Sequence, residues 1–268
     1  MPLLPFSGFQ ISETNPAVIR QAKLAVLIDA DNTQPAIIEV LLDEIAKYGI
    51  ASVKRIYGDW TNTNLRSWKD RLLEFAIQPI QQFSYTSSKN ATDSAMIIDA
   101  MDLLYSEKLD GFCIVSSDSD FTRLAARLRE SGCTVYGFGA EKTPKAFVKV
   151  CDKFIYTEIL LENQEETDED EGKPPVKARK EFKIDRKLLK LLRDAVDDIA
   201  DESGWAYLGG VGQKINNRSS EFDPRNYGFK KLGDLFRAIP QFETEERSQE
   251  HGTGRLVYIR WKKKRSAL

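Results

Sequence analysis

Short apolar segments alternate with amphipathic segments between residues 22 and 160 of the chain. Runs such as LAVLID and GFCIVSS have the length and composition of buried strands. Other segments, such as PAIIEVLLDEIAKYG, repeat apolar residues at three- and four-residue spacing, with Pro35 at the start and Gly49 at the end. The alternation of strands and helices predicts a mostly parallel sheet with helices on both faces.

Each predicted element occupies a defined range of residues. Strands are predicted at 24–29, 52–59, 77–83, 111–117, 134–139 and 153–158. Helices are predicted at 35–49, 65–75, 91–108, 120–132 and 144–150. We therefore expect one α/β domain at 22–160.

A second pattern begins near residue 181. An amphipathic helix is predicted at 183–204 and another helix within 222–240, followed by alternating strands at 241–247 and 255–262 around SQEHGTG. Helices followed by a hairpin in so short a segment predict a small winged helix-turn-helix domain of the α+β class, at 181–263.

Charge is distributed unevenly along the chain. The net charge of −2 hides −3 over 1–161, −7 over 162–172 and +8 over 173–268. The acidic segment lacks apolar periodicity and is followed by Pro174 and Pro175, so we expect a disordered linker at 161–180. The basic end indicates a nucleic-acid partner, although a merely solvated basic face is an equally good reading of charge alone.

Two residue counts narrow the chemistry. The chain has a single histidine, His251, in the loop-like segment SQEHGTG. This argues strongly against a Ser-His-Asp triad, a Cys-His pair or a His-rich zinc site. Cys113, Cys133 and Cys151 form no C-x-x-C pair, which fits free thiols in a reducing cytosol. With no apolar run of membrane-spanning length, we expect a cytoplasmic protein without a membrane partner.

Acidic residues follow two of the predicted strands. Asp29 and Asp31 end the first, and Asp118 and Asp120 end the fourth. The carboxyl ends of parallel strands meet at one edge of a sheet, where ligands bind. Asp93, in the first turn of its predicted helix, joins them. Clustered carboxylates repel one another, and all-oxygen ligands suit Mg²⁺ or Mn²⁺. Taken singly, Asp93 is also read as a dipole partner and Asp120 as a helix cap.

These motifs resemble the NYN domains, which belong to the PIN-like nucleases. The resemblance rests on LIDADN, on KNATDSAMIID and on IVSSDSDF followed by a helix, a glycine and a strand. It implies a three-layer α/β/α fold and metal-dependent RNA cleavage. By resemblance, the catalytic residues are Asp29, Asn32, Asp93, Asp118 and Asp120, and the metal ligands are Asp29, Asp93, Asp118 and Asp120. Lys89 is expected to contact phosphate, and Asp99 to be structural.

The second unit resembles the OST-HTH, or LOTUS, domain through FDPRNYGFKKLGDLF. The resemblance implies RNA binding, to single-stranded or structured RNA, and a possible protein partner. Its predicted phosphate contacts are Lys214, Arg218, Arg225, Lys230 and Lys231.

Together the patterns predict a metal-dependent ribonuclease with a C-terminal RNA-binding module. One alternative is a non-catalytic RNA-binding regulator. Another is a haloacid-dehalogenase-like phosphohydrolase, because DADNT also resembles the opening motif of that fold; a helix that starts at once at Pro35 argues against it.

Overall fold

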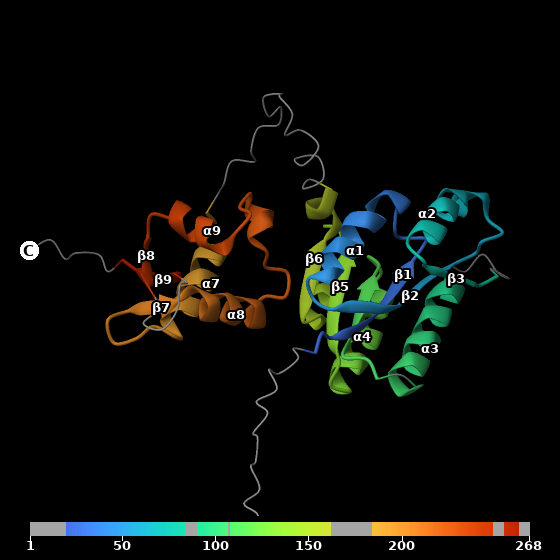
Figure 1. Cartoon of the computed structure of the whole chain (residues 1–268), viewed down its shortest axis with the longest axis horizontal. Coiled ribbons are helices and arrows are strands. Elements are labelled where there is room, and N and C mark those ends of the chain that lie inside the picture. Colours follow the sequence, from blue (N-terminus) through green and yellow to red (C-terminus); the bar gives the residue numbers. More distant parts are fainter. Residues whose placement is uncertain (1–19, 84–89, 107, 162–183, 249–254, 263–268) are drawn as a thin grey trace, which may run out of the picture.

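The computed structural model describes residues 20–83, 90–106, 108–161, 184–248 and 255–262. It contains two domains, each with its own sheet and its own apolar core (Figure 1). The acidic linker expected at 161–180 falls almost entirely outside the described residues. No helix in the described ranges has the length and apolarity needed to cross a membrane.

The N-terminal domain is built on a six-stranded parallel sheet in the order β3-β2-β1-β4-β5-β6. Its strands are β1 (Lys23–Asp29), β2 (Ile50–Gly58), β3 (Gln78–Gln81), β4 (Gly111–Val115), β5 (Thr134–Gly139) and β6 (Lys153–Tyr156). The strand order reverses between β1 and β4, where Ile28 pairs with Val115. This is the position at which open α/β sheets bind ligands.

Helices cover both faces of this sheet. They are α1 (Ile38–Ala46), α2 (Lys69–Glu74), α3 (Asn90–Ser106), α4 (Thr122–Glu130) and α5 (Lys145–Val150). Short 3₁₀ segments precede three of them, at Pro35–Ile37, Thr63–Trp68 and Ser119–Phe121.

Alternate residues of β1 face the two helical layers. Leu24, Val26 and Ile28 pack with α1 and the α2 region, while Ala25 and Leu27 pack with α3, α4 and α5. Successive side chains of a strand point to opposite faces, and a strand buried on both faces is apolar throughout. The predicted three-layer α/β/α fold is therefore confirmed.

The C-terminal domain combines three helices with a three-stranded antiparallel sheet in the order β7-β9-β8. Its elements are α7 (Arg186–Asp197), β7 (Trp205–Tyr207), α8 (Leu208–Arg218), a 3₁₀ segment (Pro224–Tyr227), α9 (Leu232–Ala238), β8 (Phe242–Ser248) and β9 (Arg255–Trp261). The predicted winged-helix architecture is confirmed. The sequence reading did not assign β7 or α8.

Local chemistry sets the boundaries of these C-terminal elements. Asp185 begins α7 by accepting a hydrogen bond from the backbone N–H of Leu188 at 2.6 Å. Gly228 ends the 3₁₀ segment with φ of 80°, a left-handed conformation that glycine adopts without a Cβ penalty.

The C-terminal domain contacts the edge strand β6 of the parallel sheet (Figure 1). The backbone N–H of Phe154 donates to the carbonyl of Ser220 at 2.8 Å, and the Ser220 hydroxyl donates to the carbonyl of Val148 at 2.7 Å. Glu221 accepts a hydrogen bond from Tyr156 and forms an ion pair with Lys145, with an N···O distance of 2.5 Å. An exposed sheet edge offers unpaired backbone groups, and this contact covers part of it.

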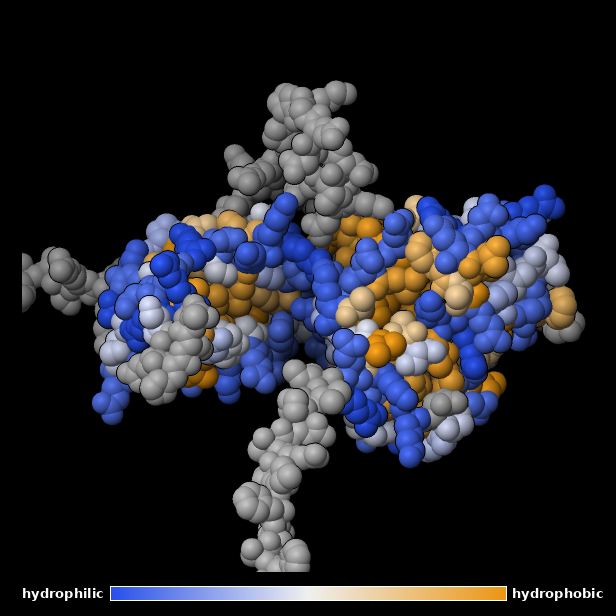
Figure 2. Space-filling view, in the orientation of Figure 1, coloured by the Kyte–Doolittle hydropathy of each residue, from blue (hydrophilic) through white to orange (hydrophobic). Residues whose placement is uncertain are grey.

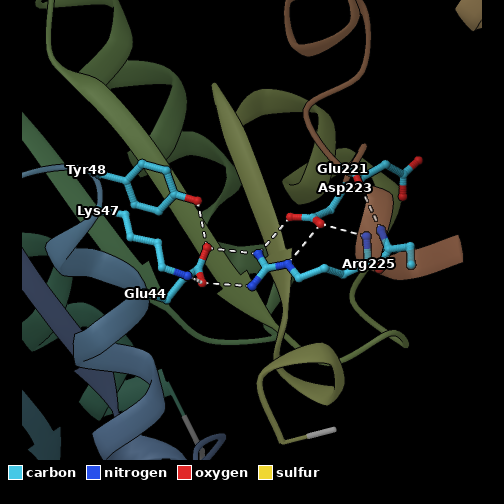
Figure 3. A network of polar contacts seen from close by, with 7 residues as sticks. Glu44, Lys47, Tyr48, Glu221, Asp223 and Arg225 are labelled. Carbon is cyan, nitrogen blue, oxygen red and sulfur yellow. Dashed lines mark hydrogen bonds and ion pairs between the residues drawn. The ribbon is translucent and has the colours of Figure 1, made fainter. Parts of the chain in front are cut away.

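A buried ion pair completes the contact between the domains. Arg225 donates two hydrogen bonds of 2.9 Å to Glu44 of α1, and it also donates to Asp223 at 2.7 Å (Figure 3). Lys47 and Tyr48 donate to the same Glu44 carboxylate at 2.7 and 2.9 Å. Residues from α1 and from the C-terminal domain therefore form one polar network.

Candidate functional site

Asp29 ends the central strand β1 and is buried, with 1% of its surface exposed. Its carboxylate accepts hydrogen bonds from the Asn32 amide at 2.7 Å, the Ser116 hydroxyl at 2.7 Å and the backbone N–H of Asp31 at 3.0 Å. Burial raises the pKa of Asp29, and these three hydrogen bonds act in the opposite direction. The side chain is thus held in one orientation at the carboxyl edge of the sheet.

Three further carboxylates come together beside Asp29. Asp93 from α3 and Asp118 and Asp120 from the turn after β4 each offer an oxygen, and these oxygens lie within 4.8 Å of one another. Asp118 caps the 3₁₀ turn by accepting the backbone N–H of Asp120 at 2.9 Å. Asp29 does not belong to this group of three. It is linked to the group through Ser116, whose hydroxyl donates to Asp29 and whose hydroxyl oxygen also accepts the backbone N–H of Asp118 at 3.0 Å.

The electrostatics of the cluster favour a cation. Burial and the negative charges of Asp29, Asp118, Asp120 and Asp31 raise the pKa of Asp93 to about 6. Grouped carboxylates must take up protons or bind a positive ion. Because every donor is a carboxylate oxygen, the residues present fit a hard divalent ion such as Mg²⁺ or Mn²⁺.

Two other residues of these sequence motifs, Asp99 and Ser116, lie outside the group of three carboxylates. Asp99, the second acid of the α3 motif, accepts hydrogen bonds from Arg55 and Tyr57 of β2 and lies away from the cluster, as a structural residue would. Ser116, which the sequence reading did not single out, joins Asp29 to Asp118. The sequence signal for Ser116 is its place two residues before Asp118 in IVSSDSDF, one of the segments that resemble NYN domains.

The predicted RNA-contact residues have varied surroundings. Lys89 lies outside the described residues. Lys214 on α8 and the neighbours Lys230 and Lys231 before α9 are exposed. Arg218 is paired with Asp198 at 2.9 Å and lines a polar cleft of about 650 Å³ between the domains. The Arg225 side chain is only 16% exposed, and its guanidinium is committed to Glu44 and Asp223.

The fold and the site define the class of this protein. A parallel sheet between two helical layers, with acids gathered at its carboxyl edge, is the architecture of a PIN-like domain. The family model of the NYN domain matches residues 23–161, and the chain belongs to the NYN domain family. The model of the OST-HTH/LOTUS domain matches residues 182–253. NYN domains are PIN-like nucleases and OST-HTH domains bind RNA. The chain therefore combines a domain of a nuclease family with a domain of an RNA-binding family.

Solved structures resemble parts of the chain. A protein of unknown function from Vibrio parahaemolyticus is 18% identical, with a TM-score of 0.43, over 51% of this chain and 93% of that one. An uncharacterized protein from Nitrosomonas europaea is 34% identical, with a TM-score of 0.29, over 35% of this chain and 88% of that one. A segment of a Chromobacterium violaceum protein is 26% identical, with a TM-score of 0.24, over 31% of this chain and 87% of that one. No curated protein matches the chain.

Proposed function

We propose that the protein is a cytoplasmic, divalent-metal-dependent ribonuclease whose C-terminal domain binds the RNA. The observation that carries the proposal is the group formed by Asp93, Asp118 and Asp120 next to the buried Asp29, at the carboxyl edge of an NYN-domain sheet. Three free cysteines suit a reducing compartment.

The acidic residues at this edge have different roles. Asp93, Asp118 and Asp120 would hold the ion, because their oxygens already converge. A bound Mg²⁺ or Mn²⁺ would stabilise the charge on the attacking and leaving oxygens during phosphodiester hydrolysis. Asn32 and Ser116 orient Asp29, and Ser116 also keeps the turn after β4 in place relative to β1.

The C-terminal domain supplies cations for the RNA backbone. Lys214, Lys230 and Lys231 lie exposed on α8 and before α9. Lysines that neutralise phosphates give sequence-independent affinity that falls as salt rises. Arg225 contributes to the joining of the domains instead, since its guanidinium is held by two carboxylates.

One comparison of substrates tests the proposal. The full chain is incubated with single-stranded RNA, single-stranded DNA and a small phosphomonoester, with Mg²⁺, Mn²⁺ or EDTA. We expect RNA cleavage that requires the metal ion and falls by orders of magnitude in Asp118→Asn, with little hydrolysis of the monoester. RNA binding without cleavage in either metal would instead identify a regulator, and monoester hydrolysis alone a phosphohydrolase.

A further inference from the structure

A second cavity opens on the N-terminal domain beside α2 and β3. Its volume is about 380 Å³, within the usual size of small-ligand pockets. Its apolar wall is formed by Trp60, Leu65, Leu72 and Pro79. Figure 2 shows apolar surface bordered by hydrophilic residues near α2. The cavity is therefore an apolar slot with a polar margin.

The indole of Trp60 is held in place at this cavity. Its ring N–H donates to the carbonyl of Ile80 at 3.0 Å, and its backbone N–H donates to the side-chain oxygen of Gln81 at 2.9 Å. Gln81 in turn donates to Asp59 at 2.9 Å. These bonds join the loop after β2 to the end of β3, and they hold the aromatic ring in one orientation. Trp60 is half-buried, so part of its surface is open to solvent.

Two cations stand at the margin of the cavity. Arg66 and Lys69 line it, and both side chains are exposed. Within the described part of the chain, neither has an ion-pair partner, and no acidic residue lines the cavity. An aromatic face beside unpaired cations is the chemistry that single-stranded nucleic acid uses, with bases stacked and phosphates neutralised.

One residue of the cavity wall, Leu65, lies at the carboxyl edge of the sheet. Leu65 packs directly over Gly58, since a Cβ on Gly58 would lie 2.6 Å from its side chain and 3.1 Å from the Cβ of Ala30. Ala30 follows Asp29 and donates its backbone N–H to Tyr57 at 3.0 Å. Leu65 of the cavity wall therefore lies beside the carboxyl ends of β1 and β2, the edge of the sheet at which Asp29 ends β1.

We propose that this cavity receives one unpaired nucleobase of the RNA substrate. The base stacks on Trp60, and Arg66 and Lys69 hold the adjacent phosphate. This inference rests on the proposed function and adds to it a subsite that places the strand at a set distance from the acids. The enzyme then senses the presence of a base at one position relative to the cleaved bond.

Abasic substitution tests the subsite. A short single-stranded RNA and a series lacking one base at a time are titrated with the full chain in EDTA, and fluorescence anisotropy gives the affinities. We expect one abasic position to weaken binding by about tenfold, the effect of losing one stacked base. In Trp60→Ala that position no longer matters, while Trp60→Phe keeps the preference. With Mg²⁺ present, the same position should raise KM.

A second variant tests the phosphate contact without touching the apolar wall. Arg66→Gln with Lys69→Gln should weaken binding of every RNA in the series and reduce the salt slope by about 0.7, the contribution of the one phosphate that both residues contact. The matched control is Arg71→Gln, because Arg71 also lies on α2 but is paired with Glu74 and does not line the cavity. It should bind as the parent does.

The outcomes separate the subsite from the proposed function. An affinity profile that is flat along the RNA, or unchanged in Trp60→Ala, overturns the subsite, while metal-dependent cleavage that is lost in Asp118→Asn still supports the nuclease. An intact profile without any cleavage supports the subsite and overturns the nuclease. Failure of the full chain to bind RNA at low salt overturns both.

Discussion

Arg225 of the C-terminal domain and Glu44 of α1 form a two-pronged ion pair with both N···O distances at 2.9 Å, although 181 residues separate them in the chain. The side chains are 16% and 4% exposed. Paired geometry of this kind is the strongest form of the interaction, and it is sensitive to the loss of either partner. The signature arginine of FDPRNYGF therefore joins the two domains.

Removing one partner of this pair should destabilise the contact between the domains. In Glu44→Gln, Arg225 keeps Asp223 but loses its second carboxylate, and we expect the free energy of unfolding to fall by about 2 kcal/mol. Chemical denaturation of the full chain measures the effect, and small-angle scattering should report a larger radius of gyration. Asp234→Asn is the control, because the side chains of Asp234 and Arg237 are about half exposed and their pair contributes little to stability. Equal losses in the two variants would contradict this account.

The same contact should weaken in acid. Burial alone would raise the pKa of Glu44, but hydrogen bonds from Arg225 and Lys47 and the charge of Arg225 lower it to about 2. A carboxylate whose pKa is lower when folded contributes stability that is complete above its unfolded pKa, near 4.5, and is lost as pH falls from there towards 2. Between pH 5 and pH 3, about where this loss begins, the parent should lose more stability than Glu44→Gln. Parallel curves would show that Glu44 does not couple to the contact.

The acid cluster makes an opposite prediction for the metal-free protein. The raised pKa of Asp93 means that its ionised form is unfavourable beside the other carboxylates. In EDTA near neutral pH, Asp93→Asn should therefore raise the free energy of unfolding by roughly 1 kcal/mol, allowing for solvent screening. Mg²⁺ should raise the melting temperature of the parent and leave the variant unchanged. Stabilisation of both proteins by Mg²⁺ would place the ion elsewhere.

RNA affinity should depend on lysines before α9 and not on Arg225. Lys230→Ala with Lys231→Ala should weaken RNA binding and lower the salt slope by about 1.4, because each phosphate contact on a single strand contributes about 0.7. Lys187→Ala with Lys190→Ala removes the same charge from α7 and serves as the control. Anisotropy across a salt series measures both slopes. Equal reductions would indicate a diffuse charge effect.

An Arg225→Leu variant completes the comparison. Because the guanidinium is already held by Glu44 and Asp223, its loss should leave the salt slope of RNA binding unchanged while destabilising the domain contact. A reduced slope with an intact contact would return Arg225 to the RNA-binding surface.

The sequence determined the sheet and the edge at which the acids gather. Residues 24–28 of β1 and 111–115 of β4 are apolar because helices bury both faces of these strands. Parallel strands bring Asp29 and Asp118 to the same edge. These are local patterns joined by one topological rule. They were sufficient to predict the three-layer fold. Among the acids that these patterns select, Asp93, Asp118 and Asp120 have side-chain oxygens within 4.8 Å of one another.

Elements with weak local signals needed the tertiary structure. The helix α8 opens with Gly209, Gly210 and Gly212, which disfavour a helix, and forms because Val211 and Ile215 are fully buried in the C-terminal core. The strand β7 has three residues and no recognisable period, and it exists by pairing with β9.

The partners of charged residues were also decided by the tertiary structure. In the sequence Arg225 lies in a basic segment, where a phosphate contact is a reasonable interpretation. In the structure the C-terminal domain packs on α1, so that Glu44 lies against Arg225 and both side chains of the ion pair are largely buried. Likewise, the fold makes Ser116 the link between Asp29 and Asp118. Charge and residue type are properties of the chain, whereas the distance between two charges and their exposure to water arise only when distant segments pack together.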